Sequence, residues 1–487
     1  MLNQMPGRTN MFPLKSQYPL TFTTSRGEFR DISSPNDNMP FTKVQFGTAE
    51  DAEKILSLIP SAQEKMRSMT AAEKIRILKA VAAEIGKNTD QLSLLVAREG
   101  GKPLKDAKVE VIRAKDTLEL CAEECWRLHG ETIPMDRTDA GKGHLNFTTR
   151  EPIGPVLAIS AFNHPLNNLA HQVGPAIASG NAVVLKPASS TPVMAFILEE
   201  MFKTAGLPAE CFMTFASSSD HIEKLYASGL FKFVSFIGSA KVGWDLRRKI
   251  PDGVRISMEH GGIASAVLRE DADLREAIPQ LVRGSFYHAG QVCISTQRIF
   301  AHRNVFEVFK NEFVQRAKKL KTGTAMDDQT DVGPLISPAE VVRIRKDIDD
   351  AIKRGAKLLC GNEVSGNNSQ FLSPTILADV PREANLMKSE IFGPVVCLNS
   401  YEDEEELVKY LNSNPYVFES CLYTKDIKAA MNLSQKISTM TMVVNNHNAF
   451  RVDWMPFGGH GLAGLGLGGP KYAMEEMTRL KQVIIKL

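Results

Sequence analysis

The spacing of hydrophobic positions divides the chain into a helical part followed by two parts in which strands and helices alternate. From Thr48 to about Arg127, apolar residues recur with the period of an amphipathic helix, and Thr48 followed by acidic residues is typical of a helix start. One predicted helical stripe consists of Ile75, Ile77, Leu78, Val81 and Ile85. We expect Gly86 and the Gly100-Gly101 pair to interrupt this helical stretch.

From Gly154 onward, short continuous apolar runs alternate with helical segments, which indicates parallel strands covered on both faces. A second helical series spans residues 273–357, and further strands are predicted near 375–377, 395–398 and 441–444. Residues 1–45 and 131–147 are turn-rich, and no internal repeat is visible. The pattern therefore predicts an α/β protein with two parallel-sheet domains and small flanking pieces.

Composition narrows the class of protein. The 487 residues are 43% hydrophobic and 23% charged, as in globular proteins. The 58 basic and 56 acidic residues nearly cancel, so neither nucleic acid nor a membrane surface is an expected partner. No apolar run reaches the ~18 residues of a membrane span, and the first residues do not resemble a signal peptide. These features favour a cytoplasmic enzyme.

The seven cysteines suggest neither a disulfide framework nor a zinc ribbon, because they are few and odd in number. Only Cys121 and Cys125 lie close together, at a spacing that suits one helical face. We therefore expect a reducing environment and no metal site.

Several polar residues fall where a predicted strand gives way to a helix, which is the edge at which α/β sheets bind ligands. Asn163 follows the strand at 155–160, and it could cap the next helix or donate its amide N–H to an oxyanion. Lys186 ends the next strand, and it could contact a ligand or simply be solvated. Glu259 ends another strand before a glycine pair, and it could be a general base or a surface carboxylate.

Residues 236–243 contain a strand end, a glycine turn and a helix start, so they offer backbone N–H groups to a phosphate. The middle glycine of a dinucleotide fingerprint is missing, and a plain strand–helix turn is an equal alternative. Cys293, in Gly290-Gln291-Val292-Cys293, could be a nucleophile or a packing residue. Glu390 precedes a turn and a strand, and alone it reads as a helix-end glutamate.

Taken in order, these motifs resemble the aldehyde dehydrogenase superfamily over essentially the whole chain from about residue 30. The match is closest to the branch acting on lactaldehyde, phosphonoacetaldehyde and, without phosphorylation, glyceraldehyde 3-phosphate. The motifs that carry the resemblance are Phe162-Asn163, Leu185-Lys186-Pro187, Phe236-Ile237-Gly238-Ser239, Glu259-His260-Gly261-Gly262, Gly290-Gln291-Val292-Cys293, Glu390-Ile391-Phe392-Gly393-Pro394 and Pro456-Phe457-Gly458-Gly459.

The resemblance implies a role for most of these residues. Cys293 would attack the aldehyde, Asn163 would hold the oxyanion, and Glu259 would activate the water that hydrolyses the thioester. The cofactor would be NAD or NADP, since Ser189 stands where the family often has a glutamate that binds the adenosine ribose. The implied cofactor-binding residues are Phe162, Lys186, Ser189, Gly238, Ser239, Gly243, Glu390 and Phe392.

Four residues resemble the substrate pocket of that branch: Arg113, His164, Arg298 and Arg451. Arginines there would bind a phosphate, phosphonate or sulfonate, although Arg113 and Arg298 could equally be structural ion-pair residues. We therefore expect oxidation of a short, anionic aldehyde. The alternatives are a semialdehyde or broad-specificity aliphatic aldehyde dehydrogenase, a cofactor-independent thiol esterase using Cys293, and an inactive scaffold or binding protein.

The resemblance also implies a domain division and an assembly. Residues 1–130 and 148–261 would form the dinucleotide-binding domain, and residues 262–455 the catalytic domain. Residues 131–147 and 465–487 would form a β arm that adds an edge strand to a neighbouring subunit, giving a homodimer or homotetramer.

Overall fold

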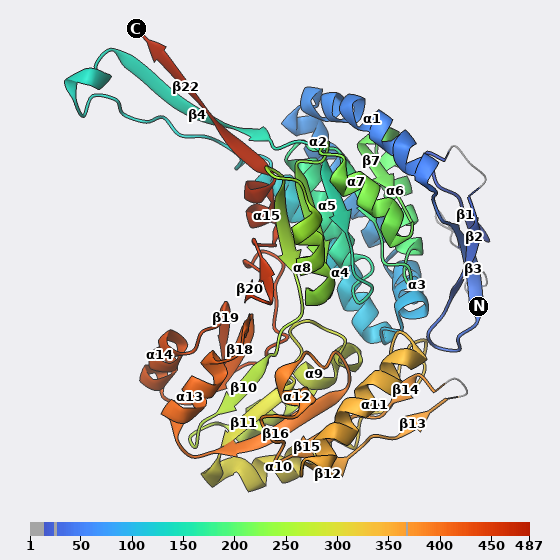
Figure 1. Cartoon of the computed structure of the whole chain (residues 1–487), viewed down its shortest axis with the longest axis vertical. Coiled ribbons are helices and arrows are strands. Elements are labelled where there is room, and N and C mark those ends of the chain that lie inside the picture. The colour runs from blue at the N-terminus through green and yellow to red at the C-terminus, as the bar shows by residue number, and fades with distance from the viewer. Residues whose placement is uncertain (1–13, 24–26, 367–368) are drawn as a thin grey trace.

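The computed structural model describes residues 14–23, 27–366 and 369–487. Parts of the turn-rich amino-terminal segment, residues 1–13 and 24–26, lie outside this description. Figure 1 shows two lobes stacked along the long axis, with a two-stranded ribbon projecting from the upper one. Of the helices in the described ranges, none is long and apolar enough to cross a membrane.

The first lobe is built on a six-stranded sheet in which five neighbouring strands are parallel. Its order is β21-β9-β8-β5-β6-β7, and the added edge strand β21 runs antiparallel to β9. The apolar runs predicted from the sequence form these strands, because side chains buried on both faces must be apolar. The bounds are β5 (Val156–Ile159), β6 (Val183–Lys186), β7 (Phe212–Thr214), β8 (Phe233–Ile237), β9 (Arg255–Glu259) and β21 (Gly464–Leu465).

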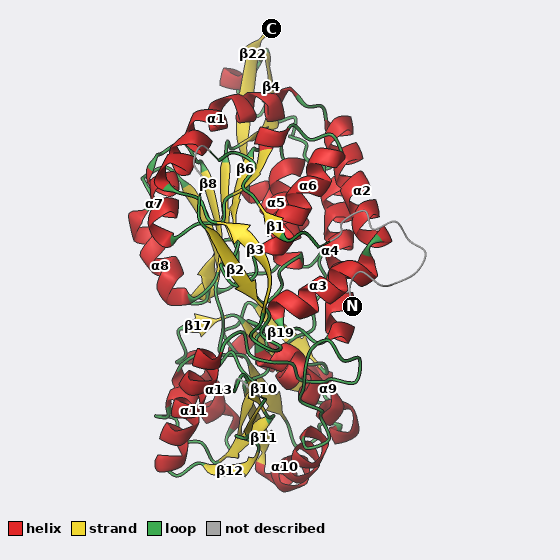
Figure 2. Ribbon diagram, turned by 90° about the vertical axis from the view of Figure 1, so that its right-hand side faces the viewer, coloured by secondary structure: helices red, strands yellow, loops and turns green. Residues whose placement is uncertain are grey.

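Helices cover both faces of this sheet. Helices α5 and α6 follow β5 and β6 on one face, and α7 and α8 follow β7 and β8 on the other (Figure 2). Strand order therefore reverses between β5 and β8, and the chain leaves the carboxyl ends of these neighbouring strands toward opposite faces of the sheet, which is where such sheets form a crevice. The bounds are α5 (Asn167–Ala178), α6 (Val193–Thr204), α7 (Ser219–Ala227) and α8 (Ala240–Lys249).

Four helices precede the sheet and pack against the helices that cover it: α1 (Ala49–Ser68), α2 (Ala71–Lys87), α3 (Thr89–Gly100) and α4 (Leu104–Glu124). The helix start predicted at Thr48 is confirmed, because its hydroxyl and the Asp51 carboxylate form a reciprocal capping box. Of the predicted stripe, Ile77, Leu78, Val81 and Ile85 are fully buried. Gly101, at φ 69°, ends α3. Gly86 was expected to interrupt the helix, but it lies inside the last turn of α2.

The second lobe is a seven-stranded sheet of order β12-β15-β16-β11-β10-β18-β19, parallel except for β12. The strands predicted near 375–377, 395–398 and 441–444 are confirmed as β15, β16 and β19. The strands are β10 (Ser265–Leu268), β11 (Arg298–His302), β12 (Lys357–Cys360), β15 (Thr375–Ala378), β16 (Val395–Tyr401), β18 (Glu419–Tyr423) and β19 (Thr441–Val444). The helices are α9 (Leu274–Phe286), α10 (Arg303–Ala317), α11 (Pro338–Lys353), α12 (Asn385–Lys388), α13 (Glu404–Asn412) and α14 (Ile427–Lys436).

The projecting ribbon pairs β4 (His144–Pro152) with β22 (Thr478–Lys486), antiparallel over their whole length. It therefore extends beyond the expected boundary at residue 147. Strand β21 and helix α15 (Pro470–Glu476), which the sequence assigned to the arm, pack against the first lobe instead. Smaller sheets pair β1 (Gln17–Tyr18) and β2 (Phe29–Ser33) with β3 (Pro40–Gln45), β13 (Val364–Ser365) with β14 (Phe371–Leu372), and β17 (Tyr416–Val417) with β20 (His460–Gly461).

Candidate active site

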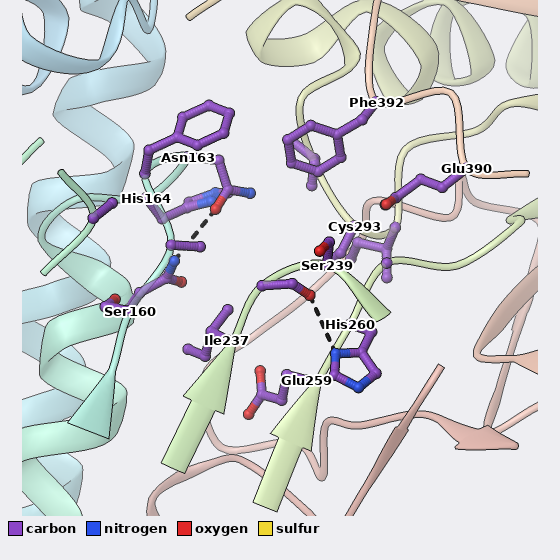
Figure 3. Close-up of a pocket in the computed structure, with 18 of the residues that line it drawn as sticks. Ser160, Asn163, His164, Ile237, Ser239, Glu259, His260, Cys293, Glu390 and Phe392 are labelled. Atoms are coloured by element: carbon purple, nitrogen blue, oxygen red, sulfur yellow. Dashed lines mark hydrogen bonds between the residues drawn. The ribbon is translucent and has the colours of Figure 1, made fainter. Parts of the chain in front are cut away.

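A cavity of about 670 Å³ opens at the carboxyl ends of β5, β6, β8 and β9, where the two lobes meet. Most of the site residues predicted from the sequence lie in its wall (Figure 3). The first lobe contributes Arg113, Phe162, Asn163, His164, Lys186, Ser189, Gly238, Ser239 and Glu259, and the second contributes Cys293, Glu390, Phe392 and Arg451.

Cys293 is presented by a strained backbone segment. After α9, His288, Ala289 and Gly290 take φ values of 49°, 54° and 69°, so two residues with side chains adopt the left-handed region. A Cβ at Gly290 would stand 2.1 Å from the carbonyl oxygen of Gly393. The nucleophile segment is thus pressed against the segment that carries Glu390, and a side chain at Gly290 would separate the two.

The surroundings of Cys293 favour its neutral thiol over the thiolate. Burial raises its pKa, and the Glu390 and Glu259 carboxylates raise it further, whereas Arg451 lowers it. Arg451 is therefore the group in the cavity wall that favours the thiolate, which is the nucleophilic form.

Asn163 faces the nucleophile segment. Its Nδ2 donates a hydrogen bond to the carbonyl oxygen of Gln291 at 3.0 Å, and its Oδ1 accepts one from Asn168 at 3.3 Å. The alternative role as a helix cap is wrong, because α5 begins after Leu166 and not after Asn163. Gln291 takes one hydrogen of the Asn163 NH2 group, so the other is left for a ligand in the cavity that Cys293 also lines.

A buried ion pair holds the segment that carries Asn163. One oxygen of Glu110 accepts hydrogen bonds from the backbone N–H groups of Leu166 (2.9 Å) and Asn167 (3.2 Å) at the start of α5. Its other oxygen pairs with Lys102, and both side chains are fully buried. Since burying a charge is costly without a partner, this pair fixes the β5–α5 turn against α4.

Glu259 ends β9 in the cavity wall, so it is not the surface carboxylate of the alternative interpretation. Burial raises the pKa of its carboxyl group, and the positive charge of Arg451 lowers it. A Cβ at Gly468 would stand 2.3 Å from Glu259 Oε1, so the carboxylate depends on a glycine from the carboxyl-terminal segment for its space. A carboxylate with a raised pKa in the same cavity wall as a thiol suits proton transfer.

One end of the cavity has the features of a dinucleotide site. Gly238 and Ser239 precede α8, whose amino-terminal N–H groups and dipole favour a phosphate. Lys186 lies in the wall rather than in free solvent, and burial lowers its pKa. Ser189 lines the same end.

Glu390 and two aromatic rings also line this dinucleotide-like end of the cavity. Within the described residues, Glu390 Oε1 is buried without a hydrogen-bond partner, and burial raises the pKa of the carboxyl group to about 8. The Phe162 and Phe392 rings meet edge to face at 5.8 Å across the cavity. An orphaned acceptor of this kind fits the hydroxyl groups of a ribose.

Gly243 lies outside the cavity wall. A Cβ there would stand 1.9 Å from the His260 ring, so this glycine allows α8 to pack closely on the segment that follows β9. The structure thus shows a packing role for Gly243, and its contact with the cofactor stays a prediction.

Arginines and a histidine surround the end of the cavity opposite the dinucleotide-like end. Arg113 donates to both oxygens of Asp453, at 2.9 and 2.8 Å. The Arg451 guanidinium lies 3.5 Å from the centre of the Phe457 ring, and its Nε lacks a partner among the described side chains and backbone. His164 is buried beside the Tyr287 ring, at 6.4 Å between centroids.

Arg298 does not belong to this end of the cavity. It begins β11, is 1% exposed, and donates through Nη2 to the carbonyl oxygens of Leu386 and Ser389. The expected contact between Arg298 and the substrate is therefore wrong: the side chain holds the segment before Glu390.

Four further residues in or beside the wall escaped the sequence analysis. Glu340 and Arg343, one turn apart on α11, form an ion pair at 2.8 Å, and Arg343 also donates to the carbonyl oxygen of Ile391. An acidic residue three positions before a basic one on a predicted helix was the available signal. No sequence pattern indicated Asp453 or Tyr287. Asp453, for example, contacts Arg113 although the two are 340 positions apart.

Comparison with known proteins agrees with this geometry. Residues 22–483 match the model of the aldehyde dehydrogenase family. The chain is 34% identical to a 3-sulfolactaldehyde dehydrogenase from Priestia aryabhattai, over 94% of this chain and 95% of that one. It superposes with a TM-score of 0.93 on aldehyde dehydrogenase 21 from Physcomitrella patens, solved with the reaction product succinate, at 35% identity and covering 97% and 99% of the two chains.

A third relative is the glyceraldehyde-3-phosphate dehydrogenase GapN from Methanocaldococcus jannaschii, solved with NADP. The TM-score is 0.90 at 34% identity, with 95% of this chain and 100% of that one covered. The predicted fold and branch are confirmed. The chain belongs to the aldehyde dehydrogenase family and is an NAD(P)-dependent aldehyde dehydrogenase.

Proposed function

We propose that the enzyme oxidises a short aldehyde with an anionic group at its far end to the free carboxylic acid. The observation that carries this proposal is the placement of Cys293, Asn163 and Glu259 in one cavity between a dinucleotide-like end and an end lined by Arg113 and Arg451.

The chemistry begins at Cys293. Its Sγ, as the thiolate, attacks the carbonyl carbon, and the oxyanion that forms accepts hydrogen bonds from Asn163 Nδ2 and from the backbone N–H of Cys293. A nicotinamide, when bound, would supply the acceptor for the hydride. Loss of the hydride from the carbon bonded to Sγ leaves a thioester on Sγ. Glu259 then takes a proton from the water that attacks the thioester, which releases the acid and restores the thiol.

The residues at the dinucleotide-like end fit NAD or NADP. Glu390 Oε1 and Lys186 would hold ribose hydroxyls, and the turn at Gly238-Ser239 would face the pyrophosphate. Ser189 is small and uncharged, so it leaves room for the 2′-phosphate of NADP where a glutamate would repel it. This supports use of NADP, which the relative from Methanocaldococcus jannaschii binds.

The cationic end supports an anionic substrate. All three relatives described above are named for, or were solved with, an anionic compound: 3-sulfolactaldehyde, succinate and glyceraldehyde 3-phosphate. In this chain, the free Nε of Arg451 offers a charge-assisted hydrogen bond to a carboxylate, sulfonate or phosphate. The cavity of about 670 Å³ would have to hold both the nicotinamide and the aldehyde, which favours a short substrate.

We also propose that the β4–β22 ribbon adds a strand to a second copy of the chain, in a dimer or tetramer. The ribbon extends away from the lobe with apolar side chains in solvent, including Leu480 (61% exposed) and Ile484 (53%). A lone two-stranded ribbon is only marginally stable, so these side chains need a further covering surface.

The deciding assay measures reduced-nicotinamide absorbance with NAD or NADP. The substrates are paired aldehydes of equal length, one with a terminal carboxylate, sulfonate or phosphate and one uncharged. We expect the charged member to give the higher kcat/KM, all turnover to vanish in Cys293→Ala, and the product to remain the free acid when coenzyme A is added. A preference for the uncharged aldehydes would refute the anionic substrate. Ester cleavage without nucleotide and without aldehyde oxidation would instead indicate a thiol esterase, and neither activity would indicate a binding protein.

A further inference from the structure

One buried side chain connects the three segments that carry Cys293, Glu259 and Glu390. Gln297 is 1% exposed and lies just before β11. Its Nε2 donates to the carbonyl oxygen of Gly262 at 3.0 Å, and its Oε1 accepts from the backbone N–H of Ile391 at 2.8 Å. Both hydrogen-bonding groups of the amide are thus engaged with backbone from two other parts of the chain.

Each end of this connection is close in sequence to a group of the proposed site. Gln297 follows Cys293 by four positions, Gly262 follows Glu259 by three, and Ile391 follows Glu390 directly. The backbone around the amide is also held, because Gln297 N–H donates to Ala264 and its carbonyl oxygen accepts from Cys397 N–H at 3.0 Å. Gln297 therefore has little freedom to move alone, and a shift of any one segment is passed to the others.

The segments have little room to rearrange. A Cβ at Gly261 would stand 1.7 Å from the Glu390 carboxylate, so the carboxylate rests directly on the backbone that follows Glu259. Arg298, the next residue after Gln297, holds the carbonyl oxygens of Leu386 and Ser389 on the other side of Glu390. Two consecutive buried side chains thus fix the segment of the proposed ribose ligand on both sides.

We infer that Gln297 is a positioning residue that keeps the nucleophile, the proposed general base and the proposed ribose-binding carboxylate in register. This inference rests on the roles proposed above for Cys293, Glu259 and Glu390. Gln297 itself touches neither substrate nor cofactor. It acts through Gly262 and Ile391, and a displacement of about 1 Å at such a site costs roughly 100-fold in rate.

Two substitutions separate the donor from the acceptor. Gln297→Met has a similar shape and removes both hydrogen bonds. Gln297→Glu keeps the acceptor for Ile391 N–H, and it can donate to Gly262 only while the carboxyl group is protonated. Ionisation turns that contact into repulsion between two oxygen atoms. A rise in pH should therefore break the contact with Gly262 in Gln297→Glu.

Gln63 is the matched control. It is also buried (6% exposed), it donates to the carbonyl oxygen of Gly180 at 3.0 Å, and it accepts from Ala182 N–H at 3.0 Å. These contacts lie at the end of β6 opposite Lys186, away from the cavity. Gln63→Met removes the same kind of bonds and reports the purely structural cost.

The experiment compares the full-length wild type, Gln297→Met, Gln297→Glu and Gln63→Met. Cofactor Kd is measured by titration calorimetry, kcat and KM by nicotinamide absorbance, stability by thermal unfolding, and protection of Ile391 N–H by hydrogen exchange. We expect Gln297→Met to raise cofactor Kd about 10-fold, to lower kcat by about 10- to 100-fold and to lose protection at Ile391. Gln63→Met should lower the melting temperature by a similar amount with both kinetic values near wild type.

For Gln297→Glu, the ratio of its kcat to that of wild type should fall as pH rises, while the same ratio for Gln297→Met stays flat. The ionisable groups around residue 297 include Cys293, Cys397, Arg298, Glu259, Glu390 and Arg343, which donates to the carbonyl oxygen of Ile391. They are common to the wild type and both variants, so the ratio isolates residue 297. Retained protection at Ile391 in Gln297→Glu would show that the acceptor half of the contact survives.

The inference is overturned if Gln297→Met matches Gln63→Met in cofactor Kd and kcat, or if the Gln297→Glu ratio does not change with pH. A wild type that binds cofactor but oxidises no aldehyde would refute the proposed function instead. In that case, unchanged cofactor Kd and unchanged Ile391 exchange in Gln297→Met would still overturn the positioning role.

Discussion

Replacement of Arg451 by methionine should lower kcat/KM for anionic aldehydes much more than for uncharged ones. Arg451 is the cation of the substrate end whose Nε lacks a partner in the described part of the chain, whereas Arg113 already gives two donors to Asp453. The Nε of Arg451 is therefore left for an anion, although its Nη2 lies 3.5 Å from His171 Nε2, and Arg113 is committed to a carboxylate.

The magnitude follows from the contact that is lost. A guanidinium about 4 Å from an anion gains about 4 kcal/mol at an effective dielectric constant of 20, and about 1.5–3 kcal/mol remains after the cost of removing water. Loss of this contact lowers kcat/KM roughly 10- to 150-fold for the anionic aldehyde. Arg451→Lys keeps the charge but loses the planar fork, so its loss should be smaller.

The assay measures kcat/KM for a four-carbon aldehyde with a terminal carboxylate and for butanal. Arg451→Met should lower the first value by the factor above and change the second much less. Equal losses on both aldehydes would refute anion recognition by Arg451 and would point to a general effect on Cys293, whose pKa Arg451 lowers.

Arg113 needs a different test, because its removal leaves Asp453 as a buried carboxylate near the substrate end. Arg113→Met should impair the anionic aldehyde by repulsion, and the second substitution Asp453→Asn should restore part of the lost activity. If the double variant is no better than Arg113→Met alone, Arg113 contacts the anion directly.

Three further outcomes are expected. Glu259→Gln should keep the first burst of reduced nicotinamide in stopped-flow absorbance and lower steady-state turnover about 10²- to 10⁴-fold, and loss of the burst as well would contradict a role limited to hydrolysis. Alkylation of Cys293 by iodoacetamide should speed up from pH 7 to pH 10, since burial raises its pKa, and should slow several-fold in Arg451→Met; an unchanged rate would show that Arg451 does not favour the thiolate. Burial raises the pKa of Glu99 from 4.5 to about 8. Between these pH values the folded protein binds more protons than the unfolded chain, so its free energy of unfolding should fall as pH rises. Glu99→Gln should flatten the dependence of the melting temperature on pH over that range.

Sequence patterns predicted the fold well where a feature depends only on residues that are near one another in sequence. The capping pair Thr48 and Asp51, the buried stripe of α2 and the continuous apolar strands depend on neighbours along the chain, so periodicity reports them. The residues at strand ends, such as Lys186 and Glu259, were predictable for the same reason: the carboxyl ends of parallel strands share one edge.

Contacts between distant segments were not predictable in this way. Arg298 follows Cys293 closely in sequence, but strand β11 turns its side chain into the second lobe, where carbonyl groups of 386 and 389 receive it. Nothing in the local pattern gives that direction. Asp453 and the packing role of Gly243 depend likewise on which surfaces meet after folding.

The ribbon of β4 and β22 also sets the order in which the molecule can be completed. Arg150 and Thr478 meet across it although they are 328 positions apart, and β21, which borders the strand of Glu259, lies in the same final stretch. During synthesis, the segments that border the first sheet and close the ribbon leave the ribosome after the strands and helices of both lobes. A chain that stops before residue 464 therefore keeps Cys293 and most of both cores, but it lacks the edge of the sheet beside Glu259 and the partner of β4, so both depend on translation of residues 464–486.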